Sequence, residues 1–203
     1  RDDLVTGVQT CALPIWTSVG IPLSDAEETD MMSHMYGIIG SPLEPLLAAK
    51  GYKQHSRCLL LGFCDGESGL QRNIYRNIRK IARKYHGLYL TGYVTTSWEH
   101  GRFSDPYLRD TIQDYGIIID TLECAVNWDN MPKVHDEVRK VVKAWPNAIC
   151  TCHISHSYPQ GANLYFIFII KTTDLDAFIA GDNGFRIEKE CCVQGVEGKR
   201  FID

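Results

Sequence analysis

Two segments of the chain are richer in aromatic and polar side chains than packing alone requires. The first runs Trp98-Glu-His-Gly-Arg-Phe-Ser-Asp-Pro-Tyr-Leu-Arg-Asp110, and the second covers residues 151–168. Each holds a residue that could do chemistry, Arg109 in the first and Tyr165 in the second. A phenol has an ordinary pKa of about 10, so it acts as a base near neutrality only where a cation or another group stabilises the phenolate. Arg109 is the candidate cation.

Both residues also have a simpler interpretation. Tyr165 lies on an expected strand beside Phe166, with Ile167 on its own face, and buried tyrosines usually pack with a partner for the hydroxyl. An ion pair with a neighbouring aspartate, Asp110 or Asp105, explains Arg109 as well as a ligand does. A guanidinium nevertheless suits a phosphate or carboxylate, because it donates two parallel hydrogen bonds.

Together the two segments resemble the C-terminal cap domain of FAD-linked oxidases of the vanillyl-alcohol oxidase type, most closely the alkyldihydroxyacetonephosphate synthase branch. The resemblance runs from about Pro22 to Phe178. Tyr165 follows a Tyr-x-x-Gly-Ala segment, here residues 158–162, and matches the catalytic tyrosine of that family. The resemblance also implies substrate-binding and FAD-binding residues. The former are Arg109, His153 and Tyr107, and the latter are Arg109, Trp98 and Arg102.

The stretch Thr121-Leu-Glu-Cys-Ala-Val-Asn-Trp128 matches a family segment of glutamate, small residues and tryptophan. A buried Glu123 would need a partner, and Arg102 or Arg109 would suit it.

The resemblance implies a reaction for the parent enzyme. An acyl-dihydroxyacetonephosphate loses a proton to the tyrosine and adds to FAD, and a fatty alcohol then displaces the fatty acid to give an ether lipid precursor. The substrate would be a small anion, and a homodimer is an expectation for the full-length enzyme. A FAD-dependent dehydrogenase of 2-hydroxy acids such as D-lactate is the alternative. An isolated cap that binds nothing is the third interpretation.

The chain holds no Gly-rich phosphate-binding loop, so we expect an upstream domain to hold most of the FAD. Residues 1–15 look like a translated sequencing adapter and are set aside as a probable artefact tail. One cap domain is expected over residues 22–178. Residues 179–203 lack the family's histidine loop, and a truncation or frame change is our hypothesis for them.

Composition indicates an ordinary soluble protein with 44% hydrophobic residues and a net charge of −4, which argues against general polyanion binding. We expect no membrane span, because no apolar run approaches the roughly 20 residues that a spanning helix needs. Eight cysteines without a secretory signal favour reduced thiols and a cytoplasmic location. Six basic residues between Arg72 and Lys84 lie opposite an apolar helical stripe, so a solvated face explains them without nucleic acid.

A motif of thiols and imidazoles, Cys150-x-Cys152-His153-x-x-His156, superficially resembles a zinc site. Alternate residues of a strand face opposite sides, so the cysteines and His153 cannot converge on one ion. We therefore expect no metal, but core cysteines and a histidine near the mouth of a site.

Periodicity predicts the elements that must position these residues. Helices are expected at 25–36, started by a capping box at Ser24-Asp-Ala-Glu27, and at 67–85 and 131–145. Strands are expected at 57–63, 88–94, 116–126, 148–155 and 163–171, and 42–53 reads as a linker. This order predicts an α+β fold, ferredoxin-like (split βαβ), with an antiparallel sheet and helices on one face.

Overall fold

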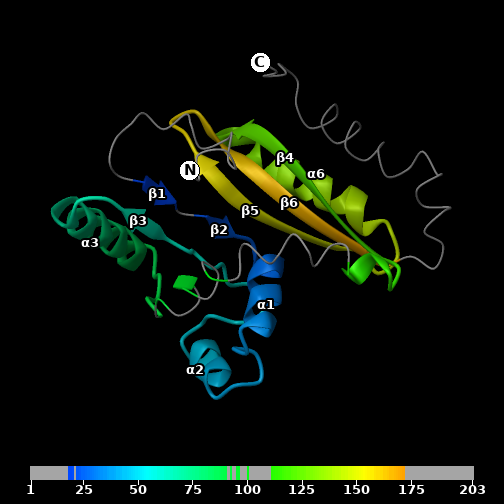
Figure 1. The fold of residues 1–203 in the computed structure, drawn as a ribbon, viewed down its shortest axis with the longest axis horizontal. Helices are drawn as coiled ribbons and strands as arrows, with labels where there is room; N and C mark the ends of the chain where they lie inside the picture. Colours follow the sequence, from blue (N-terminus) through cyan, green and yellow to red (C-terminus); the bar gives the residue numbers. More distant parts are fainter. Residues whose placement is uncertain are drawn as a thin grey trace.

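The computed structural model of the chain describes residues 18–20, 22–90, 92, 95–96, 100 and 111–171. The centre of the fold is a four-stranded antiparallel sheet in the order β2-β5-β6-β4 (Figure 1). Its strands are β2 (Leu23–Ser24), β4 (Ile117–Asn127), β5 (Ile149–Ser157) and β6 (Gly161–Lys171). The predicted α+β class and the antiparallel sheet are confirmed.

Strand β6 is the central strand and divides its side chains between two environments. Its even-numbered residues, from Ala162 to Ile170, are buried, whereas the odd-numbered residues from Asn163 to Ile169 remain partly exposed. Helix α6 (Met131–Lys143) covers the buried side and lies behind the sheet in Figure 1. The helix places its buried stripe of Val134, Val138 and Val142 in one core with Phe166. The core therefore lies on one face of the sheet, and the other face, called the open face below, carries Tyr165.

A tight contact fixes the turn that leads into β6. A Cβ atom at Gly161 would collide with the backbone carbonyl of Val126, so only glycine allows β6 to start this close to β4. The indole of Trp128, in the short 3-10 helix η2 (Trp128–Asn130), donates to the carbonyls of Tyr158 and Pro159 in the same turn. The hairpin that carries Tyr165 is thereby held to the end of β4.

Helix α1 (Ala26–Met35) lies at the β5 edge of the sheet. The predicted helix is present, but Asp25 rather than Ser24 is its N-cap, since the Asp25 carboxylate accepts from the backbone N–H of Glu28 at 2.8 Å. The backbone N–H of Asp25 itself donates to the carbonyl of Cys152 at 2.7 Å. The first turn of α1 is therefore fixed to β5.

Two predictions about the region before residue 68 are wrong. The expected strand at 57–63 is reduced to an isolated bridge between Leu60 and Leu23, followed by β3 (Phe63–Asp65), which pairs with β1 (Ser18–Gly20). The expected linker at 42–53 contains α2 (Leu43–Ala49), because proline is tolerated in the first turn of a helix. In the described part of the expected strand 88–94, residues 88–90 and 92 are not in a strand.

Helix α3 (Ser68–Lys84) forms as predicted but does not cover the sheet. It contacts β3 and stands apart from the four-stranded sheet in Figure 1, and none of its residues is buried. The prediction of helices on one face thus holds for α6 and fails for α3. Within the described residues, the first half of the predicted split βαβ order does not enter the four-stranded sheet.

Candidate functional site

Tyr165 lies in a row of side chains that crosses three strands of the open face. His153 on β5 and Glu123 on β4 are its direct partners across the two strand pairs. The imidazole of His153 stacks on the phenol ring with 5.0 Å between the ring centroids and 20° between the planes. The pairing brings an aromatic acid–base group, an imidazole and a carboxylate together in one place.

Glu123 is exposed, so the condition under which it would need an arginine partner is not met. Its Oε1 accepts from the Asn163 amide at 2.5 Å and from the Ser155 hydroxyl at 3.3 Å. These two neutral donors replace the arginine partner that burial would have required. Arg102 and Arg109, the partners predicted for it, lie outside the described residues.

The other end of the row is a carboxylate that comes from α1. Both oxygens of Glu28 lie near Nδ1 of His153, at 2.9 and 3.0 Å. Glu28 is 6% exposed, and its only described polar side-chain partner is this imidazole. The row therefore reads Glu28, His153, Tyr165 and Glu123, from α1 across β5 and β6 to the edge strand β4.

A network of charges fixes the turn of α1 that carries Glu28. Arg139 of α6 donates to Asp25 at 2.8 Å and to Glu27 at 2.6 Å, and His135 lies 3.1 Å from Asp25. Burial alone raises the pKa of Asp25, but hydrogen bonds from His135 and the backbone of Glu28, with the charge of Arg139, lower it overall. The hydrogen bond to Asp25 raises the pKa of His135.

The cysteines of β5 lie on the opposite side of the sheet from the row. Cys150 and Cys152 are buried in the core, where burial raises the pKa of the Cys150 thiol to about 12 and that of Cys152 further still. Thiols held in this state are poor nucleophiles and poor metal ligands. No group of residues suited to bind a metal ion is found in the described part of the chain, and His153 is on the other face as predicted.

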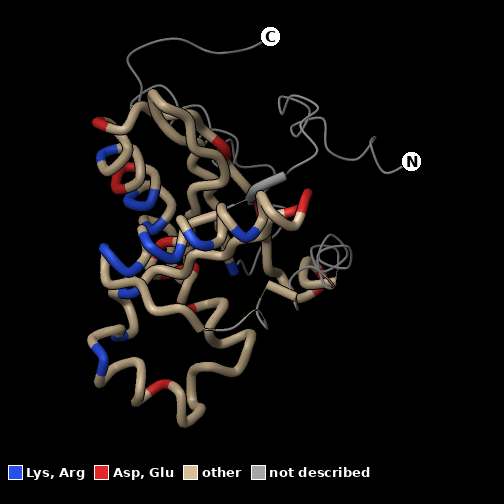
Figure 2. Tube along the Cα trace, turned by 90° about the vertical axis from the view of Figure 1, so that its left-hand side faces the viewer, with Lys and Arg blue, Asp and Glu red and all other residues tan. Residues whose placement is uncertain are grey.

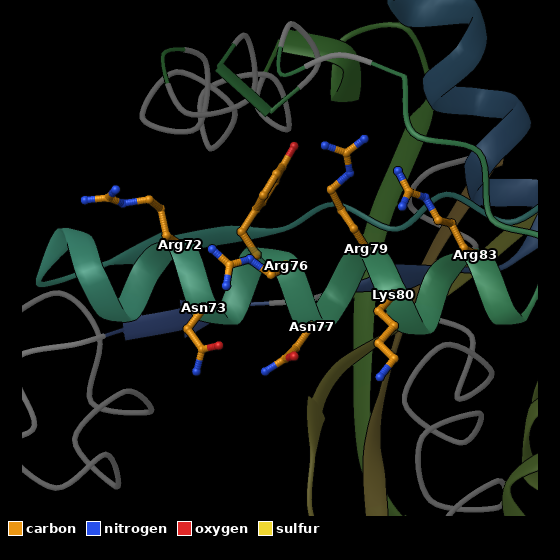
Figure 3. Close-up of a pocket in the computed structure, with 8 residues that line it drawn as sticks. Arg72, Asn73, Arg76, Asn77, Arg79, Lys80 and Arg83 are labelled. Carbon is orange, nitrogen blue, oxygen red and sulfur yellow. The ribbon is translucent and has the colours of Figure 1, made fainter.

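A second candidate site lies along α3. A cavity of about 720 Å³ follows this helix and is lined by Arg72, Asn73, Tyr75, Arg76, Asn77, Arg79, Lys80 and Arg83 (Figure 3). Viewed from the side of α3, Figure 2 shows Lys and Arg in runs along the chain. Arg79 stacks on Tyr75 and Tyr89, with its guanidinium carbon 5.6 and 4.9 Å from the ring centroids.

This basic surface offers charge but no imidazole, carboxylate or thiol among its lining residues. It can attract an anion, yet it holds no group that accepts a proton near neutral pH. The row on the open face is therefore the better candidate for a reactive site.

Four of the predicted site residues lie outside the residues that the structure describes. They are Trp98, Arg102, Tyr107 and Arg109. Of the predicted site, Tyr165 and His153 are described, and they are in direct contact. Glu28 was not predicted, and no local pattern indicates it, because it meets His153 across 125 residues of sequence.

The described residues around Tyr165 do not match the phosphate groups of FAD. A pyrophosphate needs cations or converging N–H donors, whereas the row contains two carboxylates and no lysine or arginine paired with them in the described residues. The described part of the row thus suits a substrate or a flavin ring better than a nucleotide.

Comparison with known proteins relates part of the chain to one family. Residues 92–178 match the family model of the FAD linked oxidases, C-terminal domain. Its members are FAD-dependent enzymes. The predicted resemblance is confirmed, and β4, α6, β5 and β6 all lie within the matched range.

Two curated relatives with similar sequences are both alkyldihydroxyacetonephosphate synthases. The chain is 31% identical over 87 residues to the alkyldihydroxyacetonephosphate synthase of Dictyostelium discoideum, covering 38% of this chain and 14% of the relative. It is 24% identical over 132 residues to the synthase of Caenorhabditis elegans, covering 59% of this chain and 21% of the relative. The chain therefore spans about a fifth or less of the length of these relatives.

Solved structures of alkyldihydroxyacetonephosphate synthase in two crystal forms share the fold. They superpose with TM-scores of 0.64 and 0.62 at 21% and 22% identity. Each alignment covers 86% of this chain and 33% of the synthase chain.

Proposed function

We propose that this chain is the substrate-facing cap of a FAD-dependent enzyme that, like alkyldihydroxyacetonephosphate synthase, exchanges an acyl for an alkyl group on dihydroxyacetone phosphate. The position of Tyr165 carries the proposal. It lies on the open face of β6 rather than in the core, inside the segment matched to the FAD-linked oxidases. A tyrosine needed for packing alone would be expected on the buried face with Phe166.

In this proposal Tyr165 is the proton acceptor. A C–H bond breaks on the ester-bearing carbon of the substrate, next to the ketone, and the phenolate oxygen forms the new O–H bond. The electron pair of the broken bond stays on that carbon, where the ketone delocalises it. His153 lies against the ring of this tyrosine and contributes to the substrate pocket. Over the full exchange a fatty alcohol adds its oxygen, a fatty acid leaves, and there is no net change in redox state.

We assign the substrate anion to the first polar segment. Arg109 binds the phosphate through its planar guanidinium, and Tyr107 lines the same region. Trp98 and Arg102 contact the cofactor. These four assignments rest on the resemblance of this segment to the family.

The test uses a flavin-containing protein that carries residues 22–171 of this chain unchanged. It is incubated with an acyl-dihydroxyacetone phosphate and an isotopically labelled fatty alcohol, and the labelled ether product is measured by mass spectrometry. We expect label in the product and an equal amount of released fatty acid. Bleaching of the flavin by a 2-hydroxy acid, without incorporation of the alcohol, would replace the proposal with a dehydrogenase.

A further inference from the structure

Glu28 is a buried carboxylate that the reaction proposed above does not use. A charged carboxyl group is costly to bury unless a partner compensates it. Glu28 is 6% exposed, and the imidazole of His153 is its only described polar side-chain partner. This pairing joins α1 to the open face at the residue that stacks on Tyr165.

The contact determines which nitrogen of His153 carries a proton. An ionised carboxylate only accepts hydrogen bonds, so Nδ1 must be the donor in this pair. Nδ1 then keeps its proton in both the neutral and the charged imidazole, and Nε2 is the nitrogen that gains or loses one. A carboxylate that holds an imidazole in one tautomer and offsets its positive charge is a recognised device for orienting a base.

We infer that Glu28 is a positioning residue of the Tyr165 site and acts through His153. By holding Nδ1 it fixes the plane of the imidazole, and the stacked imidazole fixes the plane of the phenol. It also makes Nε2 the proton-accepting nitrogen of an imidazole that is stacked on Tyr165. The part of this inference that concerns turnover rests on the proposed function, whereas the tautomer and the stacking do not.

Glu28 can act in this way because other groups anchor its helix. Asp25 caps α1, and Glu27 binds Arg139 at 2.6 Å and the backbone N–H of Cys150 at 3.4 Å. Removal of the Glu28 side chain should therefore leave α1 in place. Glu137 supplies a control, since it is an exposed glutamate of α6 that lies 3.7 Å from Lys140 and takes no part in anchoring α1.

The tautomer is measured by ¹⁵N NMR on this chain with labelled histidine, together with the Overhauser effect between the rings of His153 and Tyr165. We expect a protonated Nδ1 and a strong ring-to-ring effect in the parent chain. Glu28→Ala should change the tautomer ratio by roughly tenfold or more, as for loss of a hydrogen bond to a charged group, and should weaken the ring contact. Glu28→Gln should give a smaller shift, and Glu137→Gln should match the parent.

An Nε2-protonated His153 in the parent chain would overturn the inference, as would a tautomer ratio unchanged in Glu28→Gln. The glutamine variant keeps the side-chain volume, so it decides the question if the alanine variant does not fold.

The same variants are then tested for turnover in the flavin-containing protein. We expect Glu28→Gln to lower kcat by up to about 100-fold, as mispositioning of a reactive group does, with little change in KM. Glu137→Gln should keep the parent values. A change confined to KM would overturn the positioning role. A parent without exchange activity would contradict only the proposed function, because the NMR result does not depend on turnover.

Discussion

The reactivity proposed for Tyr165 depends on the face of β6 on which it lies. Its neighbours in sequence, Leu164 and Phe166, point into the core, while its neighbours in space are a paired imidazole and an exposed carboxylate. The alternation of a strand predicts that adjacent residues separate in this way. It does not predict which partners the open face receives, because His153 and Glu28 come from other elements.

The pair of Asp25 and His135 predicts how the stability of the protein depends on pH. The lowered pKa of Asp25 means that its contribution to stability is present above the ordinary carboxyl value of 3.8 and is lost as pH falls through the folded value. The raised pKa of His135 has the opposite effect on how stability depends on pH. Its contribution is present below 6.5 and is lost as pH rises through the folded value.

We therefore expect Asp25→Asn to reduce the loss of stability at both ends of this pH range. Asparagine is a good N-cap, so α1 should still begin at the same residue. The measurement is the free energy of urea unfolding from below pH 3.8 to above pH 6.5. Asp136→Asn, which removes the exposed partner of His135, is the control and should change the profile little. An identical pH profile in Asp25→Asn and the parent would contradict the account.

At the scale of elements, two amphipathic helices of similar pattern have different surroundings. Helix α6 buries Val134, Val138 and Val142, whereas the apolar stripe of α3 leaves Leu70 and Ile81 more than 40% exposed. Periodicity predicts that a helix has an apolar face, but not which surface covers it. Among the described residues, the partner of α3 is the short strand β3.

This difference in burial predicts that truncating an apolar side chain lowers stability more in the core than on α3. Phe166→Ala removes a fully buried ring and should lower the free energy of unfolding by about 3–5 kcal/mol. Ile81→Ala removes a side chain that is 59% exposed and should cost within about 0.5 kcal/mol. Urea unfolding of both variants at one pH makes the comparison. Equal costs would show that the stripe of α3 is covered in solution.

The sequence predicts the matched part of the fold well and the region before it poorly. Strands β4, β5 and β6 and helix α6 were expected within a few residues of their bounds, because branched residues and apolar spacing are continuous there. The run Arg57-Cys-Leu-Leu-Leu-Gly-Phe63 is equally apolar, but a strand also needs a paired neighbour, and only Leu60 forms a bridge to Leu23. Local pattern carries no information about such pairing.

The residues of the candidate site could likewise be predicted only in part. Tyr165 and His153 could be predicted because they lie in one polar, aromatic segment and pair across one hairpin. Glu28 could not, since it is one of several acidic residues on α1 and only the tertiary fold selects it.

At the scale of the whole molecule, residues 92–178 match the C-terminal domain of the FAD-linked oxidases, and the fold is similar to 33% of a solved synthase chain. In the described residues, no helix is long and apolar enough to cross a membrane. The four-stranded sheet has one face covered by α6 and one face that carries the polar row. Under the proposed function, the cofactor of the full-length enzyme would lie against this open face.

The turnover of Tyr165→Phe tests this account most directly. The substitution removes one hydroxyl, keeps the ring stacked on His153 and is made in the flavin-containing protein used above. We predict that the protein stays folded and yellow while exchange falls by roughly 100- to 10,000-fold, the range typical of a lost general base. Full exchange activity in this variant would contradict the claim that the open face of the sheet is the reactive face.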